Sequence, residues 1–307
     1  MSANSQNLFD RALLRQRRER VQDEMAGVDF LLQRAAIEID ERLDLVLRDF
    51  PVALDLGAGH GVMAAKLTAR TDVEQVIAAD HSAALLQNLS GVTKIVCDEE
   101  ALPVSEASLN LVSSVLSLHF VNDLPGALIQ IRRALKPDGL FMAALPGGQT
   151  LIELRTAFMM AEEEILGGVS PRIAPMADVK DYGALLQRAG FSLPVVDSDF
   201  VNVTYESPLK LMRELRLMGA GNVLTDRLKK PMSRRLLQRV VEIYEQQFST
   251  DGRINATFET IHMSGWSPHE SQQQPLVPGS AQTSLSAALG SCALADSPPE
   301  NEDDKEG

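Results

Sequence analysis

The chain has 307 residues, of which 45% are hydrophobic and 23% charged, and its formal net charge at pH 7 is −13. This length allows one enlarged domain or two small ones, and the acidic balance argues against nucleic acid as the partner, because phosphate binding needs clustered lysine and arginine. The two cysteines, Cys97 and Cys292, are too few for a cysteine-based zinc or iron–sulfur site. No apolar run is long enough to span a membrane and no signal peptide is visible. We therefore predict a cytoplasmic protein.

The first two elements are predicted to be helices. Residues 8–24 combine helical spacing with five arginines, so that the segment 1–27 is expected to hold a basic N-terminal helix. Such a helix is either a solvated amphipathic helix or a lid that closes over an acidic substrate or cofactor. Apolar residues keep helical spacing from Val28 to Asp49 and predict a second helix, which leads to Pro51 and the first strand.

A glycine loop follows the first predicted strand, Val52–Leu56. It has a G-x-G-x-G pattern, formed by Gly57, Gly59 and Gly61. Glycine lets the backbone take positive φ and lets a ligand lie against it, while the amides at the start of the next helix face that ligand. The dinucleotide pattern G-x-G-x-x-G would need glycine at Val62. The loop therefore favours an adenosine-bearing cofactor other than NAD, with an ordinary tight turn as the alternative.

Beyond this loop, strands and helices alternate, which is typical of a doubly wound parallel sheet. Further strands are predicted at 75–79, 92–97, 109–115, 140–145, 193–205 and 256–266, and the turn Lys136–Gly139 is expected to precede the strand at 140. Helices are predicted at 62–70, 82–89, 123–135, 150–166, 178–189, 208–218 and 233–248. The predicted fold class is α/β: a Rossmann-like, mostly parallel sheet of seven strands, with N-terminal helices and a helical insertion before the last strand.

Carboxylates are expected beside the glycine loop. Asp80 ends the second strand, where a carboxylate can accept hydrogen bonds from both hydroxyls of a ribose; the alternative is a cap for the following helix. Asp98 follows the third strand and can accept a hydrogen bond from an adenine amino group, with Glu99 beside it; the alternative is a turn aspartate. Together with Asp55, which lies near the glycines, these residues predict a site for S-adenosylmethionine.

The catalytic residues are harder to predict, because methyl transfer depends mainly on alignment of the reactants. His119, after the fourth strand, is a candidate base or a donor to a substrate carbonyl; the alternative is a partly buried histidine that bonds to the backbone. The set His262, His269 and Glu270 has the chemistry of a facial iron triad. Its sequence context does not favour one, so that no metal is predicted.

Several motifs carry a resemblance to one family. They are Leu8-Phe9-Asp10-Arg11, Leu54-Asp55-Leu56-Gly57-Ala58-Gly59-His60-Gly61, the run from Leu116 to Pro125, Leu135-Lys136-Pro137-Asp138-Gly139 and the run from Gly265 to Gln272. With them the chain resembles class I S-adenosylmethionine-dependent methyltransferases. More closely, it resembles the family of mitochondrial complex I assembly factors with that fold and its alphaproteobacterial relatives. A more distant similarity is to the malonyl-carrier-protein methyltransferases of biotin synthesis.

The resemblance implies a methyltransferase-fold domain over 28–266, with a cofactor half at 50–147 and a substrate or cap half at 148–255. It also implies methyl transfer to a protein-borne or carrier-protein-borne substrate, such as a subunit of complex I. The alternatives that it implies are arginine hydroxylation on such a subunit, without methyl transfer, and malonyl-carrier-protein methylation. A bacterial cytoplasmic protein is expected, since the Phe-Asp-Arg motif leaves no room for a transit peptide. The Ser-, Pro- and acid-rich tail, 267–307, is expected to be disordered.

Overall fold

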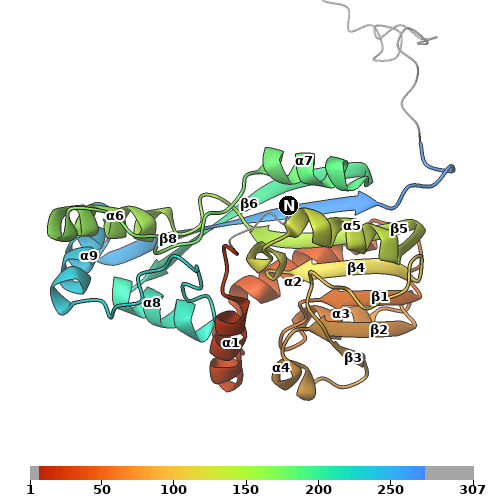
Figure 1. Cartoon of the computed structure of the whole chain (residues 1–307), viewed down its shortest axis with the longest axis horizontal. Coiled ribbons are helices and arrows are strands. Elements are labelled where there is room, and N and C mark those ends of the chain that lie inside the picture. Colours follow the sequence, from red (N-terminus) through yellow and green to blue (C-terminus); the bar gives the residue numbers. More distant parts are fainter. Residues whose placement is uncertain (1–6, 274–307) are drawn as a thin grey trace, which may run out of the picture. The chain divides into compact units, whose positions relative to one another are not determined.

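The computed structural model describes residues 7–273 (Figure 1). Most of the predicted tail, from residue 274 onward, lies outside the described residues. The helices are α1 (Arg11–Met25), α2 (Phe30–Asp44), α3 (Val62–Ala69), α4 (Ala83–Gln87), α5 (Leu124–Ala134), α6 (Ile152–Leu166), α7 (Val179–Ala189), α8 (Pro208–Leu217) and α9 (Arg234–Gln247), with a 3-10 turn, η1, at Leu118–Phe120. The strands are β1 (Val52–Leu56), β2 (Gln75–Asp80), β3 (Thr93–Val96), β4 (Leu109–Val115), β5 (Leu135–Pro146), β6 (Ser192–Tyr205), β7 (Ser249–Thr250) and β8 (Arg253–Trp266).

The strands form one sheet in the order β3-β2-β1-β4-β5-β8-β6. Strands β1 to β5 are parallel to their neighbours, whereas β8 is antiparallel to both β5 and β6. The predicted fold class is therefore confirmed. The path has the seven strands that we predicted, and the two-residue strand β7, which pairs with β8, is an eighth. The strand order reverses between β1 and β4, which is where an open α/β sheet forms its ligand crevice.

Helices cover both faces of the parallel part of the sheet. Alternate residues of β1 point to opposite faces: Leu54 and Leu56 pack in one core cluster with residues of α5 and α7, while Ala53 packs in another with residues of α2 and α3. Strands β6 and β8 have 14 residues each and continue past the parallel strands (Figure 1). Their far ends form a third cluster with α6, α8 and α9, which is the helical insertion that the sequence predicted before the last strand and is called the cap below.

Local sequence sets several helix starts. The side chain of Asp10 caps α1 by accepting a hydrogen bond from the Leu13 amide at 3.0 Å. At α7, Asp178 and Asp181 form a reciprocal capping box. No helix within residues 7–273 is long and apolar enough to cross a bilayer.

The predicted turn at Lys136–Gly139 is wrong as an element boundary. Strand β5 already begins at Leu135, which pairs with Leu109 of β4. The ladder is then irregular until Leu140 pairs with Leu111, and Asp138 has a φ of +61° between these two points. The proline and glycine thus produce a bulge-like interruption inside the strand, because β4 supplies pairing partners on both sides of it.

Candidate cofactor site

The predicted cofactor residues come together at the carboxyl ends of β1, β2 and β3. These strands are neighbours, with Leu56 paired to Ala79 and Asp80 paired to Val96. The glycine loop folds over the end of β2, because the Gly57 amide donates to the Ala79 carbonyl at 2.8 Å. Three segments that are separate in the sequence therefore line one crevice.

The glycines of the loop have three different surroundings. All have positive φ, +74° at Gly57, +55° at Gly59 and +87° at Gly61, as predicted. A Cβ at Gly57 would lie 2.1 Å from Ser117 Oγ, and one at Gly61 would lie 2.3 Å from a methyl carbon of Leu89. A Cβ at Gly59 would meet no atom within 4 Å. Open space for a ligand therefore lies over Gly59, while the other two glycines make room for the protein's own side chains.

Asp80 holds the loops together. Its Oδ2 accepts a hydrogen bond from the Gly59 amide at 3.0 Å, and its Oδ1 accepts one from the Ser82 amide at 2.8 Å. The N-cap of α4 is Ser82, whose hydroxyl accepts from the Leu85 amide, so that Asp80 is not the cap. A carboxylate offers about four lone-pair positions. Two therefore remain on Asp80, one of them beside the His81 ring, whose Nδ1 lies 3.4 Å from Oδ1.

The two acidic residues after β3 have different positions. The side chain of Asp98 is 51% exposed; it accepts from the Glu100 amide at 2.9 Å, as a turn aspartate does, and lies 3.3 Å from Arg11. Glu99 is buried, accepts a hydrogen bond from Ser117 Oγ at 3.2 Å and pairs with Arg11. Of the two, Glu99 is the residue that reaches the inside of the crevice.

Asp55 adds a further carboxyl below the glycine loop. Its pKa is raised to about 7: burial is the largest cause, a hydrogen bond from the Ala64 backbone opposes it, and the nearby Asp80 carboxylate adds a smaller increase. Its Oδ2 is buried and has no hydrogen-bond partner among the described residues. An unsatisfied acceptor at this depth fits a site that receives donors from a ligand.

His119 lies in the turn η1, directly after β4. Its ring centroid is 4.0 Å from that of Phe120, and its Nδ1 is buried without a partner in the described part of the chain. Burial, followed by the positive charge of Arg18, lowers its pKa to about 3. The imidazole is therefore neutral at physiological pH and can act only as a weak base there.

Helix α1 covers this crevice. Arg11 pairs with Glu99, Ser82 Oγ donates to Glu19 at 2.7 Å, and Arg18, 9% exposed, lies over the ring of Phe120. Helix α1 is thus packed onto the crevice, and its role as a lid stays a prediction. No role is predicted for Arg18 from the sequence, although its spacing from Arg11 puts both on one helix face with the buried Leu14.

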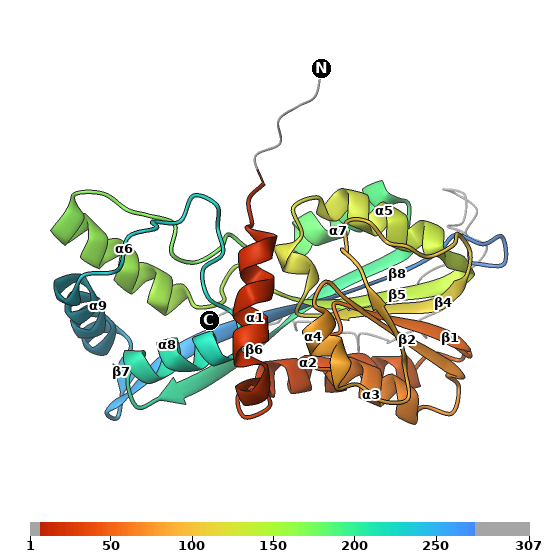
Figure 2. The same ribbon diagram turned by 60° about the horizontal axis from the view of Figure 1, so that its bottom comes forward.

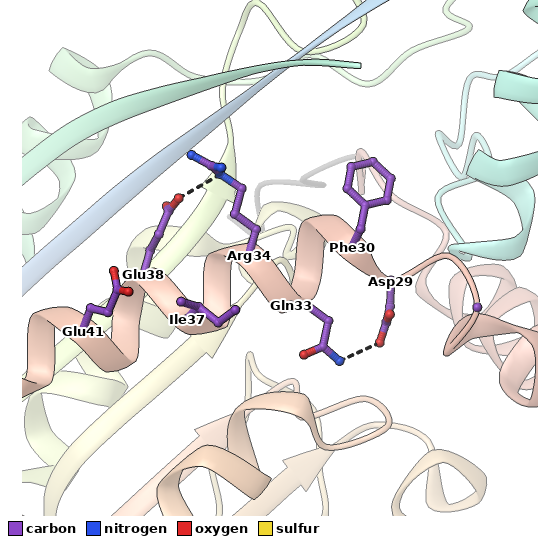
Figure 3. A pocket seen from close by; sticks show the side chains of 8 residues that line it. Asp29, Phe30, Gln33, Arg34, Ile37, Glu38 and Glu41 are labelled. Carbon is purple, nitrogen blue, oxygen red and sulfur yellow. Dashed lines mark hydrogen bonds and ion pairs between the residues drawn. The ribbon is translucent and has the colours of Figure 1, made fainter. Parts of the chain in front are cut away.

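A hollow of about 680 Å³ lies elsewhere, along the exposed face of α2 (Figure 3). It is lined by Gly27, Asp29, Phe30, Gln33, Arg34, Ile37, Glu38 and Glu41. Its polar side chains bind one another: Arg34 lies 2.8 Å from Glu38, and Gln33 donates to Asp29 at 3.0 Å. None of the predicted cofactor residues lines it, because all of its lining residues lie between Gly27 and Glu41.

The histidines do not assemble a metal centre. In the part of the chain that the structure describes, no group of three His, Cys, Asp or Glu side chains is placed to hold a metal ion. Instead, Nε2 of His262 lies 2.6 Å from Oε2 of Glu38, and Nε2 of His60 lies 2.9 Å from Oδ2 of Asp29.

Comparison with known proteins identifies the fold and its relatives. Residues 54–143 match the family model of a methyltransferase domain. Over 291 residues the chain is 39% identical to the Danio rerio protein named arginine-hydroxylase NDUFAF5, mitochondrial, covering 92% of this chain and 90% of that one. The human protein of the same name is 40% identical, with coverages of 92% and 84%. A malonyl-[acyl-carrier protein] O-methyltransferase of Methylovorus sp. strain MP688 is 34% identical over 274 residues, with coverages of 85% and 90%.

Among solved structures, a methyltransferase candidate from Bacillus halodurans C-125 superposes with a TM-score of 0.53 at 16% identity, covering 76% of this chain and 98% of that one. At this identity the likeness shows the fold alone. Together these matches confirm the predicted methyltransferase fold, and they agree with S-adenosylmethionine as its cofactor.

Proposed function

Because the chain belongs to the family of methyltransferase-fold proteins that includes the NDUFAF5 arginine hydroxylases, we propose that it binds S-adenosylmethionine in the crevice beneath α1 and acts on a protein-borne group. The amino-acid end of the cofactor would lie over Gly59 with Asp55 nearby, the ribose at Asp80, and the adenine beside Asp98 and Glu99. In this proposal residues 50–147 form the cofactor half and residues 148–255 the substrate half, and the protein works in a bacterial cytoplasm.

One observation carries the cofactor proposal. A Cβ at Gly59 would meet open space, and the same amide that borders this space donates to Asp80, whose carboxylate keeps two acceptor positions. A ligand with a ribose could therefore bond to Asp80 while its charged end lay on the glycine backbone. When bound, S-adenosylmethionine supplies an electrophilic methyl group; the residues of this chain orient it and exclude water.

Calorimetry with S-adenosylmethionine tests this proposal. We expect the wild-type protein to bind it and Asp80→Ala to lose at least about tenfold in affinity, because bonds to a charged acceptor are worth roughly 1.5–3 kcal/mol. Asp199→Ala is the matched control, since Asp199 lies on β6, outside the crevice, and pairs with Arg34 of α2. No binding to the wild type, or equal affinities for all three proteins, would reject the cofactor site.

A second function is favoured by the relatives at 39% to 41% identity, which are named arginine hydroxylases. In that case the chain hydroxylates an arginine of a client protein, such as a subunit of respiratory complex I, and methyl transfer does not occur. Mass spectrometry of complex I subunits from wild-type and deletion strains tests this. An arginine peptide heavier by one oxygen is expected only in the wild type, and identical peptides in both strains would reject the function.

The relative at 34% identity favours a third function, methylation of a malonyl group on a carrier protein. This function predicts that a deletion strain needs biotin for growth. Growth without biotin, in a strain with no second such enzyme, would exclude it.

A further inference from the structure

The surroundings of Arg18 are unusual for an arginine. Its guanidinium carbon lies 5.3 Å from the centroid of the Phe120 ring, and its Nη2 donates a long hydrogen bond, 3.5 Å, to the carbonyl of Leu116 at the end of β4. The side chain is 9% exposed. It thus sits inside the crevice at the point where strand β4 ends, beside the glycine loop.

The charge of Arg18 is not fully compensated there. Burial lowers its pKa, and the carboxylates of Asp80 and Glu99 raise it by less, while the nearby Arg11 lowers it again. A buried guanidinium in such a position pays a desolvation cost that its partners do not fully return. It is therefore an occupant that a better-matched group can displace.

The groups around Arg18 are those that recognise an organic cation. Its guanidinium lies over the Phe120 ring and donates to the Leu116 carbonyl, and the carboxylates of Asp80 and Glu99 act on its charge from a greater distance, without an ion pair. A desolvated cation over an aromatic ring is attracted by the negative face of the ring. An anion would be repelled by the same carboxylates, so that the pocket selects positive charge.

Helix α1 also blocks access to these carboxylates. Asp80 and Glu99 are both almost completely buried, and α1 passes across the crevice between α4 and α8 (Figure 2). The helix is anchored at its start, where the Asp10 amide donates to the Val223 carbonyl at 2.8 Å and Phe9 packs edge-on against Phe120. A ligand can reach Asp80 only after this helix has moved.

We propose that the surroundings of Arg18 form a cation subsite of the active crevice. While α1 is closed, Arg18 occupies this subsite as an internal plug. When α1 moves away, a cationic group of a ligand takes the place of Arg18. This inference rests on the proposed function and adds a self-inhibitory contact to it. Two sources can supply the cation: the sulfonium of S-adenosylmethionine, or the guanidinium of a client's arginine.

Removal of the plug tests the proposal. Arg18→Gln removes the charge, Arg18→Met keeps the apolar volume, and Arg18→Lys keeps a cation. The affinities of each variant for S-adenosylmethionine, for the uncharged S-adenosylhomocysteine and for argininamide are measured by calorimetry. If the closed form holds about nine tenths of the wild-type population, the open-form affinity is masked about tenfold, and removing the plug restores it.

The source of the cation decides which ligand gains. Both adenosine ligands need α1 open, so both gain about tenfold in Arg18→Gln and Arg18→Met. A cofactor subsite predicts that S-adenosylmethionine binds these variants more tightly than S-adenosylhomocysteine and that argininamide does not bind. A client subsite predicts that argininamide also gains about tenfold and that the two adenosine ligands bind with equal affinity. In both cases Arg18→Lys stays close to the wild type.

Other outcomes reject the plug. Weaker binding of S-adenosylmethionine to Arg18→Gln and Arg18→Met would make Arg18 a cofactor ligand, and unchanged affinities for all three ligands would leave no cation subsite. Arg15→Gln is the matched control, because this substitution also removes one positive charge from α1. Arg15 is exposed and lies 3.9 Å from Glu19. The proposed function fails separately, if neither adenosine ligand binds to the wild type or to any variant.

Discussion

The two sides of the crevice are built in different ways. The floor, made by Asp55, Gly57–Gly61 and Asp80, is held by hydrogen bonds between backbone groups and one carboxylate on adjacent parallel strands. The cover, helix α1 with Phe9 before it, is held by side-chain contacts to distant segments, such as the Phe9 amide with Asn122 Oδ1 and Arg17 with the Asn222 carbonyl. The floor is thus fixed by the sheet itself, whereas the cover depends on side-chain contacts.

The largest effect is expected at Gly57, in the floor. Gly57→Ala combines a φ of +74° with a Cβ 2.1 Å from Ser117 Oγ, so that we expect a loss of about 2–4 kcal/mol in the free energy of unfolding, measured with urea. Gly252→Ala is the control, because its φ is +75° and its Cβ would meet open space. We expect about 1 kcal/mol there. Equal losses would mean that Ser117 yields freely and that the floor is not rigid.

The next effect depends on pH. The pKa of Asp55 is raised from 3.8 to about 7 in the folded protein. Between pH 3.8 and about pH 7 the folded state therefore binds more protons than the unfolded state. The free energy of unfolding falls as the pH rises through this range. Asp55→Asn removes this penalty. We expect it to exceed the wild type by up to about 3 kcal/mol at pH 8 and to equal it near pH 4, in thermal unfolding.

Asp197 provides a control of opposite sign. Its hydrogen bond with Arg42 lowers the pKa of this half-exposed carboxyl, so that its contribution is present above pH 4 and is lost as the pH falls through the folded pKa. Asp197→Asn should therefore lose less than about 1 kcal/mol at pH 8 and nothing near pH 2. A difference between Asp55→Asn and wild type that does not change with pH would contradict the raised pKa.

The smallest effect is expected in the cap. Buried Glu162 of α6 accepts hydrogen bonds from the amide and hydroxyl of Ser170, each at 2.6 Å, and pairs with Arg172. Burial acts to raise its pKa, but these bonds outweigh it and keep the pKa low. Glu162→Gln should cost about 1–2 kcal/mol and speed hydrogen exchange in residues 167–175. Binding of S-adenosylmethionine should not change; a parallel loss of binding would couple this loop to the floor.

Most of the fold could be predicted, because apolar periodicity indicates each helix or strand from its own residues, and the glycine and proline positions indicate where these elements end. The sequence predicts the strands β4 and β6 to within one residue, and the glycines of the floor permit the positive φ that the loop has. The interruption inside β5 could not be predicted, because the pairing partner on β4 decides whether a Pro-Asp-Gly segment leaves the sheet or remains in it.

The sequence by itself determined the strand that ends in Asp55, the glycine loop, and the carboxylate of Asp80 at the next strand end. Only the tertiary structure decided that Gly59 alone of the three glycines faces open space, that Glu99 points inward while Asp98 is half exposed, and that Arg18 enters the crevice. The physical reason is the range of the contacts. Backbone conformation follows from neighbouring residues. Helical spacing places Arg18 on one face of α1, but its final position depends on Leu116, 98 residues away, which the sequence does not show.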